Sequence, residues 1–138
     1  MTKKIILISC VSRKRSHRAA AQDLYTSTLF TLNLRYARQL KPDAIFILSA
    51  KHGLLAPETM IDPYNVTLNE MSAPALRQWA ERVRDQLAAC ADLERDHFIF
   101  LAGNNYRKHL LPHIRHYDVP LEGLRIGEQL GRLKALTT

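Results

Sequence analysis

The stretch K-I-I-L-I-S, residues 4–9, decides the fold, because a short apolar run rich in β-branched residues is typical of a buried strand. Two similar runs follow, A-I-F-I-L-S at residues 44–49 and H-F-I-F-L-A at residues 97–102. Their starts, at residues 4, 44 and 97, leave room for a helix between successive strands. This βαβ pattern predicts an α/β fold, a single three-layer domain over residues 1–138 with a mostly parallel central sheet flanked by helices.

The segments between and after these runs carry helical patterns. Apolar residues recur at helical spacing over Ser72–Cys90, with Ser72 suited to the N-cap. We expect further helices over Thr26–Leu40 and Tyr106–His116, the latter kinked or shortened by Pro112. The glycine-containing tail, Leu121–Leu136, predicts a turn that leads into a final helix.

The charge balance points to an acidic partner. The chain carries 20 Lys and Arg against 13 Asp and Glu, a formal net charge of +7. Clustered cations gain affinity for nucleic acids and nucleotides by releasing counterions from phosphates. We therefore expect a nucleotide or nucleic-acid partner. A basic surface that only keeps the protein soluble is the alternative, since net charge does not reveal clustering.

Cysteine content and hydropathy indicate the compartment. The chain has only two cysteines, which does not resemble a secreted disulfide framework. No apolar run approaches the roughly 20 residues that span a bilayer. We expect a cytoplasmic protein without membrane insertion. The sequence leaves the oligomeric state open.

Polar segments follow all three predicted strands. Because ligands of open α/β sheets bind beyond the carboxyl ends of the parallel strands, we expect these segments to converge on one edge. After the first strand, Ser9, Ser12 and Lys14 are candidates for holding a phosphate, although a solvated basic loop is an equal alternative. No G-x-x-x-x-G-K-[ST] loop is present, which argues against a conventional ATPase.

The second strand ends in Ser49, followed by Lys51, His52 and Gly53. We interpret Ser49 and Lys51 as ligand-binding residues and Gly53 as a point of close backbone approach. An imidazole such as His52 acts near neutral pH as an acid, a base or a donor to developing charge, so His52 is a candidate catalytic residue. A structural, hydrogen-bonded histidine is the alternative.

The remaining candidates lie in later loops. Asp62 is expected to position water and Tyr64 to stack on a base, the alternative being a turn set by Pro63 with Tyr64 packed against the sheet. Asn104 has the groups that read a base edge, although an asparagine at a helix start more commonly serves as an N-cap. Tyr106, at the start of the predicted helix beside it, is a further candidate ligand-binding residue.

One further carboxylate is a candidate for acid–base chemistry, whereas no metal site is indicated. Glu122 is a candidate acid or base, with a solvated surface carboxylate as the alternative. The six histidines lack the spacing to Cys or acidic residues that would specify zinc, and no cofactor is expected.

Ordered motifs span nearly the whole chain: I-S-C-x-S-x-K, D-L-Y-T-S-x-L-F, I-L-S-A-K-H-G-L-L, I-D-P-Y-x-x-T-L, F-L-A-G-x-x-Y-R and L-E-G-L-R-I-G-E-Q-L. Together they resemble a small bacterial and phage family of unknown function. Ile47–Pro57 and Ile61–Tyr64 also resemble the YaaA peroxide-stress proteins, which have Tyr where this chain has His52. That resemblance implies an α/β protein that binds DNA and limits oxidative damage, but this chain has no evident helix-hairpin-helix segment.

A more distant similarity, in an S-x-x-G-L pattern after a strand, is to uracil-DNA-glycosylase-like domains and the related domain of archaeosine synthase. The sequence therefore predicts an enzyme acting on a nucleotide or nucleic acid, with cleavage or exchange of an N-glycosidic bond as its reaction. The alternative is a non-catalytic DNA-binding stress or phage-defence protein, whose cations contact backbone phosphates and whose loop residues are structural.

Overall fold

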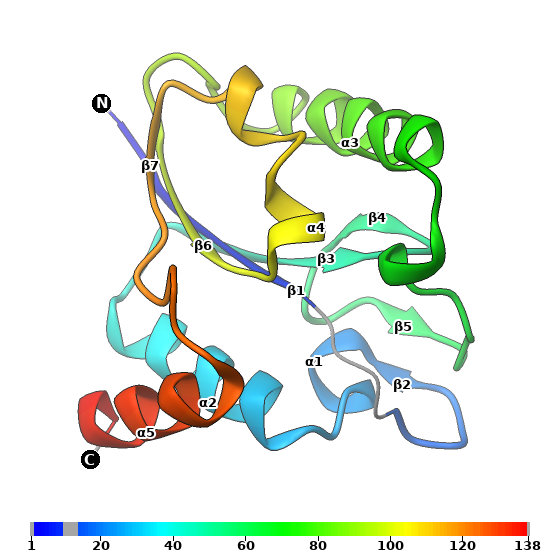
Figure 1. The fold of residues 1–138 in the computed structure, drawn as a ribbon, viewed down its shortest axis with the longest axis vertical. Coiled ribbons are helices and arrows are strands. Elements are labelled where there is room, and N and C mark those ends of the chain that lie inside the picture. Colours follow the sequence, from blue (N-terminus) through cyan, green and yellow to red (C-terminus); the bar gives the residue numbers. More distant parts are fainter. Residues whose placement is uncertain (1, 10–13, 138) are drawn as a thin grey trace.

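A five-stranded sheet forms the middle layer of the computed structural model, which describes residues 2–9 and 14–137 (Figure 1). Its strand order is β4-β3-β1-β6-β7. The strands are β1 (Lys4–Ser9), β3 (Ala44–Ser49), β4 (Gly53–Leu55), β6 (His97–Leu101) and β7 (His116–Asp118). β1, β3, β6 and β7 run parallel, and β4 pairs antiparallel with β3 at one edge. The predicted α/β fold with a mostly parallel sheet is confirmed.

The three apolar runs form the centre of the sheet because both of their faces are covered. β1 lies between β3 and β6, with Ile6 opposite Ile45 on one side and Ile99 on the other. From Ile5 onward every residue of β1 is buried, as expected for a parallel strand between two helical layers. The first two strands have the predicted bounds, and the third ends one residue early, at Leu101.

Helices cover both faces of the sheet (Figure 1). α1 (Ala21–Leu24), α2 (Thr28–Gln39) and α5 (Ile126–Leu136) lie on one face, and α2 contacts both β1 and α5. α3 (Ala73–Ala88) and the single-turn α4 (Asn104–Arg107) lie on the other face. The predicted helices at Thr26–Leu40 and Ser72–Cys90 and in the tail are confirmed within a few residues at their ends.

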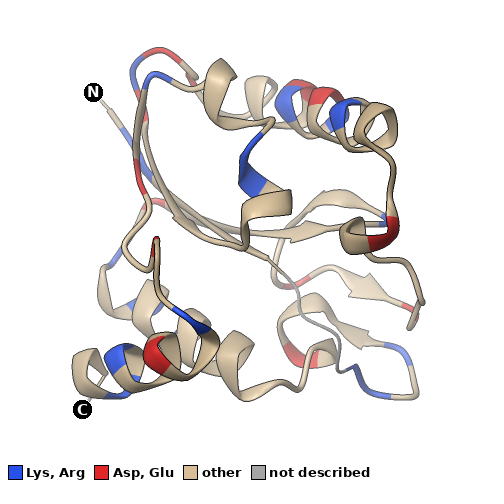
Figure 2. Ribbon diagram, in the orientation of Figure 1, with Lys and Arg blue, Asp and Glu red and all other residues tan. Residues whose placement is uncertain are grey.

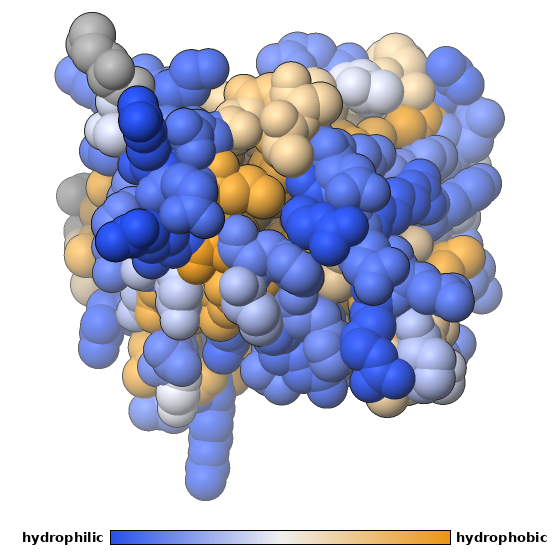
Figure 3. Space-filling model, turned by 90° about the horizontal axis from the view of Figure 1, so that it is seen from above, coloured by the Kyte–Doolittle hydropathy of each residue, from blue (hydrophilic) through white to orange (hydrophobic). Residues whose placement is uncertain are grey.

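The caps of α2 and α3 explain where these helices begin. The Ser27 hydroxyl accepts the Phe30 N–H at 3.1 Å, and the Ser72 hydroxyl accepts the Ala75 N–H at 3.3 Å, which satisfies donors that have no helical partner. α3 buries its apolar stripe against the sheet, whereas the outer surface seen in Figure 3 is mostly hydrophilic. No helix in the described part of the chain combines the length and hydropathy needed to cross a membrane.

The predicted helix over Tyr106–His116 is wrong. In its place the chain forms the last residues of α4, a 3-10 turn η2 (Leu111–His113) and strand β7. Pro112 lacks the N–H that a continuous helix needs, and the side chains of Leu110 and Ile114 are buried on either side of η2. β7 then pairs with β6, and the His97 Nε2 lies 2.8 Å from Asp118 Oδ2 across this pair.

The predicted polar segment after β3 folds into a hairpin. Gly53 adopts φ 73°, and a Cβ at this position would fall on the Gln86 side chain of α3. Gln86 Oε1 accepts the Leu54 N–H at 2.9 Å, and Gln86 Nε2 donates to the His52 carbonyl at 3.3 Å. The close approach at Gly53 is therefore made by Gln86, which ties the hairpin to α3.

A small two-stranded ribbon is drawn below this hairpin in Figure 1. Its strands, β2 (Ala19–Ala20) and β5 (Met60–Ile61), pair antiparallel. The chain then passes through a short 3-10 helix, η1 (Leu68–Glu70), before α3 begins. Neither the ribbon nor η1 carries a sequence pattern long enough to predict an element.

The connections place a ligand crevice at one point of the sheet. β1 leads through α2 to β3 on one side, whereas β6 leads to β7 on the other side. The chain therefore leaves the carboxyl ends of the neighbouring strands β1 and β6 in opposite directions. Such a switch point opens a crevice at which open α/β sheets bind their ligands.

Candidate functional site

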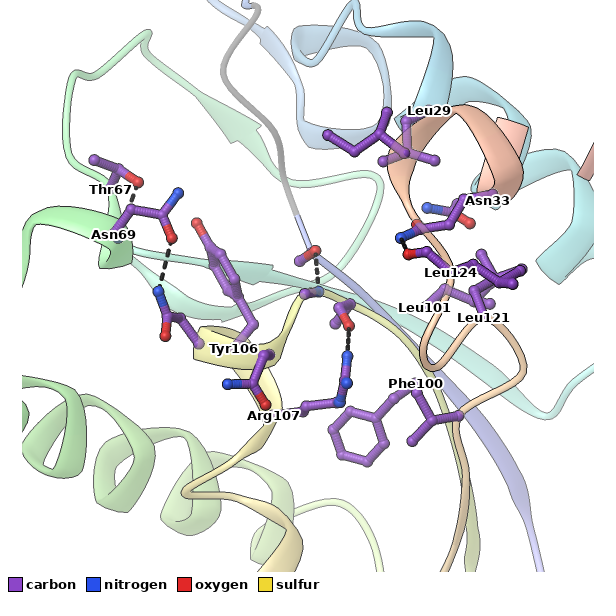
Figure 4. Close-up of a pocket in the computed structure, with 18 of the residues that line it drawn as sticks. Leu29, Asn33, Thr67, Asn69, Phe100, Leu101, Tyr106, Arg107, Leu121 and Leu124 are labelled. Atoms are coloured by element: carbon purple, nitrogen blue, oxygen red, sulfur yellow. Dashed lines mark hydrogen bonds between the residues drawn. The ribbon is translucent and has the colours of Figure 1, made fainter. Parts of the chain in front are cut away.

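A cleft of about 790 Å³ opens at this switch point (Figure 4). Its floor includes Ser9 at the end of β1 and Gly103 just after β6. The Gly103 N–H donates to the Ser9 hydroxyl at 3.3 Å, which joins the two strand ends. Ser9 Oγ is the acceptor in this bond, and a serine hydroxyl can also donate one hydrogen bond.

One side of the cleft is polar and the other apolar. Thr67, Asn69, Tyr106 and Arg107 lie on one side in Figure 4, and Leu29, Asn33, Leu121 and Leu124 lie on the other. The apolar side comes from α2 and from the connection between β7 and α5. This division suits a ligand with an apolar body and a polar or charged end.

The ionic groups of the cleft leave an excess of positive charge. Lys14 and Arg107 line it, with Glu70 as the one carboxylate among its described lining residues. A guanidinium nitrogen of Arg107 donates to the Ala102 carbonyl at 2.7 Å, which fixes that side chain at the end of β6. Two cations against one carboxylate favour an anionic ligand.

Amide side chains surround these charges. Asn105 Nδ2 donates to Asn69 Oδ1 at 2.8 Å, and Gln129 Nε2 donates to the Leu124 carbonyl at 2.9 Å. Asn33 differs from them, because its side chain is buried and its Oδ1 has no hydrogen-bond partner within the described residues. Amides that combine donor and acceptor groups are suited to reading a base edge.

A hydrogen-bonded cluster of Tyr25, Ser49 and Tyr64 lies beside the cleft, behind Lys14. The Tyr64 hydroxyl is 2.8 Å from Ser49 Oγ and 2.6 Å from the Tyr25 hydroxyl. Lys14 Nζ lies 4.7 Å from the centroid of the Tyr64 ring, in cation–π contact. The buried Ser49 thus fixes the tyrosine ring on which the Lys14 ammonium rests.

His52 also belongs to this cluster, through contacts with Ser49 and Tyr64. Its backbone N–H donates to Ser49 Oγ at 3.1 Å, and its ring meets the Tyr64 ring edge-on at 5.5 Å between centroids. Its Nε2 is buried without a hydrogen-bond partner within the described residues. Burial lowers the pKa of His52 below its ordinary value of 6.5, and the positive charges of Lys51 and Arg82 lower this pKa further.

The lowered pKa of His52 predicts a pH-dependent loss of stability. Just below pH 6.5, the ordinary His value, the unfolded chain binds a proton at His52 more readily than the folded protein does. The free energy of unfolding should therefore be highest above this pH and should fall as the pH drops below it. Urea unfolding from about pH 5 to about pH 8 measures this, and His52→Gln should flatten the profile. Identical slopes for both proteins would contradict the assignment.

The structure brings some predicted site residues to the cleft and leaves others outside it. Ser9, Lys14, Asn104 and Tyr106 line the cleft. Ser49, His52 and Tyr64 form the cluster behind Lys14, so Tyr64 is held by Ser49 and Tyr25 and packs against the core. The predicted N-cap role for an asparagine is wrong, because Gly103 is the N-cap of α4. Ser12 lies outside the described residues.

Four further predicted residues belong neither to the cleft lining nor to this cluster. Asp62 is exposed and forms an ion pair with Arg18 at 3.3 Å. Glu122 is exposed in the turn before α5, and Lys51 is exposed at the hairpin tip. Gly53 packs against Gln86, as described above. The described residues also contain no group of three or more Cys, His, Asp or Glu arranged to hold a metal ion.

Sequence reasoning missed Tyr25, Asn33, Asn69 and Glu70 as site residues. Tyr25 and Glu70 have no local signal, because their positions depend on how the loops pack against the strand ends. Asn33 did have a signal, since it stands on the otherwise apolar face of α2, where a polar residue needs a reason.

Comparisons with known proteins locate the chain within a family. No curated protein matches it significantly, so the resemblances to YaaA proteins and to uracil-DNA-glycosylase-like domains stay predictions. Residues 5–135, nearly the entire chain, match a family of unknown function. The protein therefore belongs to the family of unknown function DUF6884.

Proposed function

We propose that this protein binds a nucleotide, free or as a unit of nucleic acid, in the cleft between β1 and β6 and cleaves its N-glycosidic bond. The observation that supports the proposal best is the joint presence of two cations, amide side chains and an apolar wall at the switch point of the sheet. A phosphate, a base edge and the faces of a base need these three kinds of surface respectively.

The phosphate binds on the cationic side of the cleft. Lys14 supplies an ammonium held over the Tyr64 ring, and Ser9 supplies a hydroxyl. Arg107 adds a guanidinium that is already oriented by the Ala102 carbonyl. Prior orientation by protein groups reduces the entropy that these side chains lose when they bind an anion.

The reaction needs one carboxylate near the sugar. Glu70 takes this role in the proposal, because Asp62 and Glu122 do not line the cleft. The Glu70 carboxylate removes a proton from water, the water oxygen bonds to the anomeric carbon, and the bond to the base nitrogen breaks. The proton taken from water passes from Glu70 to the departing base, so the products are the free base and the sugar phosphate and Glu70 is again a carboxylate. His52 does not contact the ligand in this proposal. It packs against the Tyr64 ring, which in turn contacts the Lys14 ammonium.

The direct test is to incubate the protein with pooled nucleotides and with normal and modified DNA and RNA, and to measure bound ligands and released bases by mass spectrometry. Release of a free base is expected. Binding without release would support the alternative, a non-catalytic DNA-binding protein, to which the net charge of +7 also points. That alternative predicts a steep fall in affinity with salt. The Lys and Arg residues in Figure 2 are spread over several elements. Because a long nucleic acid binds best to clustered cations, this spread favours a compact ligand such as a single nucleotide.

Replacing Lys14 with Met should weaken nucleotide binding roughly tenfold or more, because a charge-assisted contact to phosphate is lost while the stem is kept. Lys51→Met is the matched control, since it removes the same charge from an exposed site outside the cleft lining. Titration calorimetry measures both. Equal losses in the two variants would mean that net charge, not the cleft, holds the phosphate.

A further inference from the structure

The position of Glu70 depends on how the short 3-10 helix η1 is held. Its internal hydrogen bonds are those of a single turn, since the Thr67 hydroxyl accepts the Asn69 N–H at 3.2 Å and the Thr67 carbonyl accepts the Glu70 N–H at 3.4 Å. Leu68 is fully buried and anchors η1 in the core, whereas Asn69 and Glu70 are exposed. Apolar contacts are not directional, so this anchor alone does not fix the orientation of the exposed side.

A side-chain hydrogen bond joins this exposed side of η1 to α4. Asn105 Nδ2 donates to Asn69 Oδ1 at 2.8 Å, and Figure 4 draws this bond beside the Tyr106 ring. A hydrogen bond is directional, since it weakens steeply when donor and acceptor are misaligned. The bond between the two asparagines therefore restricts how η1 is oriented relative to α4.

α4 is itself firmly held and can act as the support. Tyr106 is 8% exposed and packs edge-on against the Trp79 ring of α3, with 5.7 Å between the ring centroids. Trp79 Nε1 in turn donates to the Ser49 carbonyl at the end of β3 at 2.9 Å. At the other end of the turn, Arg107 donates to the Ala102 carbonyl at 2.7 Å. These contacts tie α4 to two strand ends.

The same bond connects two parts of the proposed active site. Asn105 lies in the single turn of α4 that also carries Arg107, which holds the phosphate in the proposed function. Asn69 directly precedes Glu70 in η1. The bonded pair is accessible to solvent, so it replaces hydrogen bonds to water and adds little net stability. Its consequence is geometric, because it sets where Glu70 lies relative to Arg107.

Resting on the function proposed above, we infer that Asn105 is a positioning residue for the cleavage reaction. Through its bond to Asn69 it holds the Glu70 carboxylate at a fixed place relative to the bound phosphate, without contacting the reacting atoms itself. Misplacing a catalytic group by about 1 Å costs roughly a hundredfold in rate. A turn released from one bond still visits the correct orientation part of the time, so the loss should be smaller than that.

Asn105→Ala should lower the saturated rate of base release about tenfold and leave the half-saturating concentration within about twofold. The rate is measured by mass spectrometry with the pool of nucleotides, DNA and RNA used in the direct test, over a range of concentrations. Gln22→Ala is the matched control, because Gln22 accepts a surface hydrogen bond from Arg38 at 2.9 Å outside the cleft lining. This control should keep the wild-type rate, and both variants should melt near the wild-type temperature.

A double variant tests whether the two asparagines act as a pair. Asn69→Ala should cause the same loss as Asn105→Ala, and the double variant should lose no more than either one, because each single change already breaks the bond. Losses that multiply in the double variant would mean that the residues act separately. A raised half-saturating concentration with an unchanged saturated rate would mean that Asn105 contacts the ligand. Either result would overturn the inference.

The rates also separate this inference from the proposed function. Release that is lost in Glu70→Gln but unchanged in Asn105→Ala would overturn the inference while the proposed function stands. Release that survives Glu70→Gln would overturn the inference as well, because that carboxylate would then need no positioning. If the wild-type protein releases no base from any member of the pool, the proposed function falls and the inference falls with it.

Discussion

Replacing Glu70 with Gln is expected to lower the rate of base release about a hundredfold or more while leaving nucleotide affinity within about threefold. The amide keeps the size of the side chain but cannot take a proton from water. Glu70 is the carboxylate that lines the cleft in the described structure, so its loss leaves no other lining carboxylate there to replace it. Single-turnover rates of release, measured by mass spectrometry, test this directly.

Asp62→Asn and Glu122→Gln are the matched controls, because each removes one carboxylate charge at an exposed position outside the cleft lining. Both variants should retain the wild-type rate. A loss of release in either of them with full activity in Glu70→Gln would return the catalytic role to the residues that the sequence indicated.

Replacing Asp96 with Ala is expected to lower the free energy of unfolding by about 3 kcal/mol, because two backbone N–H groups lose a charged acceptor. Asp96 is 4% exposed, and its carboxylate accepts the N–H groups of Lys3 and Asp92, each at 2.8 Å. These bonds fasten the start of β1 to the turn that precedes β6. Urea unfolding followed by circular dichroism measures the change.

Asp85→Ala is the control, since Asp85 is exposed and pairs only with its neighbour Arg84 among the described contacts, so the change should stay below about 0.5 kcal/mol. The backbone hydrogen bonds from Asp92 and Lys3 also hold the pKa of Asp96 below its ordinary value of 3.8. The stability contributed by this charge is present above that value and is lost as the pH falls through the folded-state pKa. The advantage of the wild type over Asp96→Asn should therefore shrink in acid.

The sequence predicted the centre of the fold well because burial on both faces leaves an unambiguous pattern. Continuous β-branched and aromatic runs marked β1, β3 and β6, and the caps Ser27 and Ser72 agree with the predicted helix starts. Strand β7 was missed because all three of its residues are exposed, so they show no alternation of apolar and polar side chains. Its place is set by pairing with β6, which no local signal reveals.

Only the cleft residues that lie at or shortly after the strand ends could be predicted from the sequence. Ser9, Lys14, Asn104 and Tyr106 were found because carboxyl ends of parallel strands share one edge. Asp62 was misplaced because its position follows from the pairing of β2 with β5 and from its ion pair with Arg18, both of which are tertiary contacts. Asn33 and Glu70 reach the cleft from a helix face and a 3-10 turn, which that rule does not cover.

A nucleotide bound in the cleft between β1 and β6 should be visible in amide chemical-shift mapping with adenosine monophosphate. Saturable shifts centred on Ser9, Asn33, Asn69 and Gly103 are expected, and these residues belong to four different segments of the chain. Shifts centred instead on the β2–β5 ribbon and Arg18, or no saturable shifts at all, would rule out nucleotide binding in the cleft.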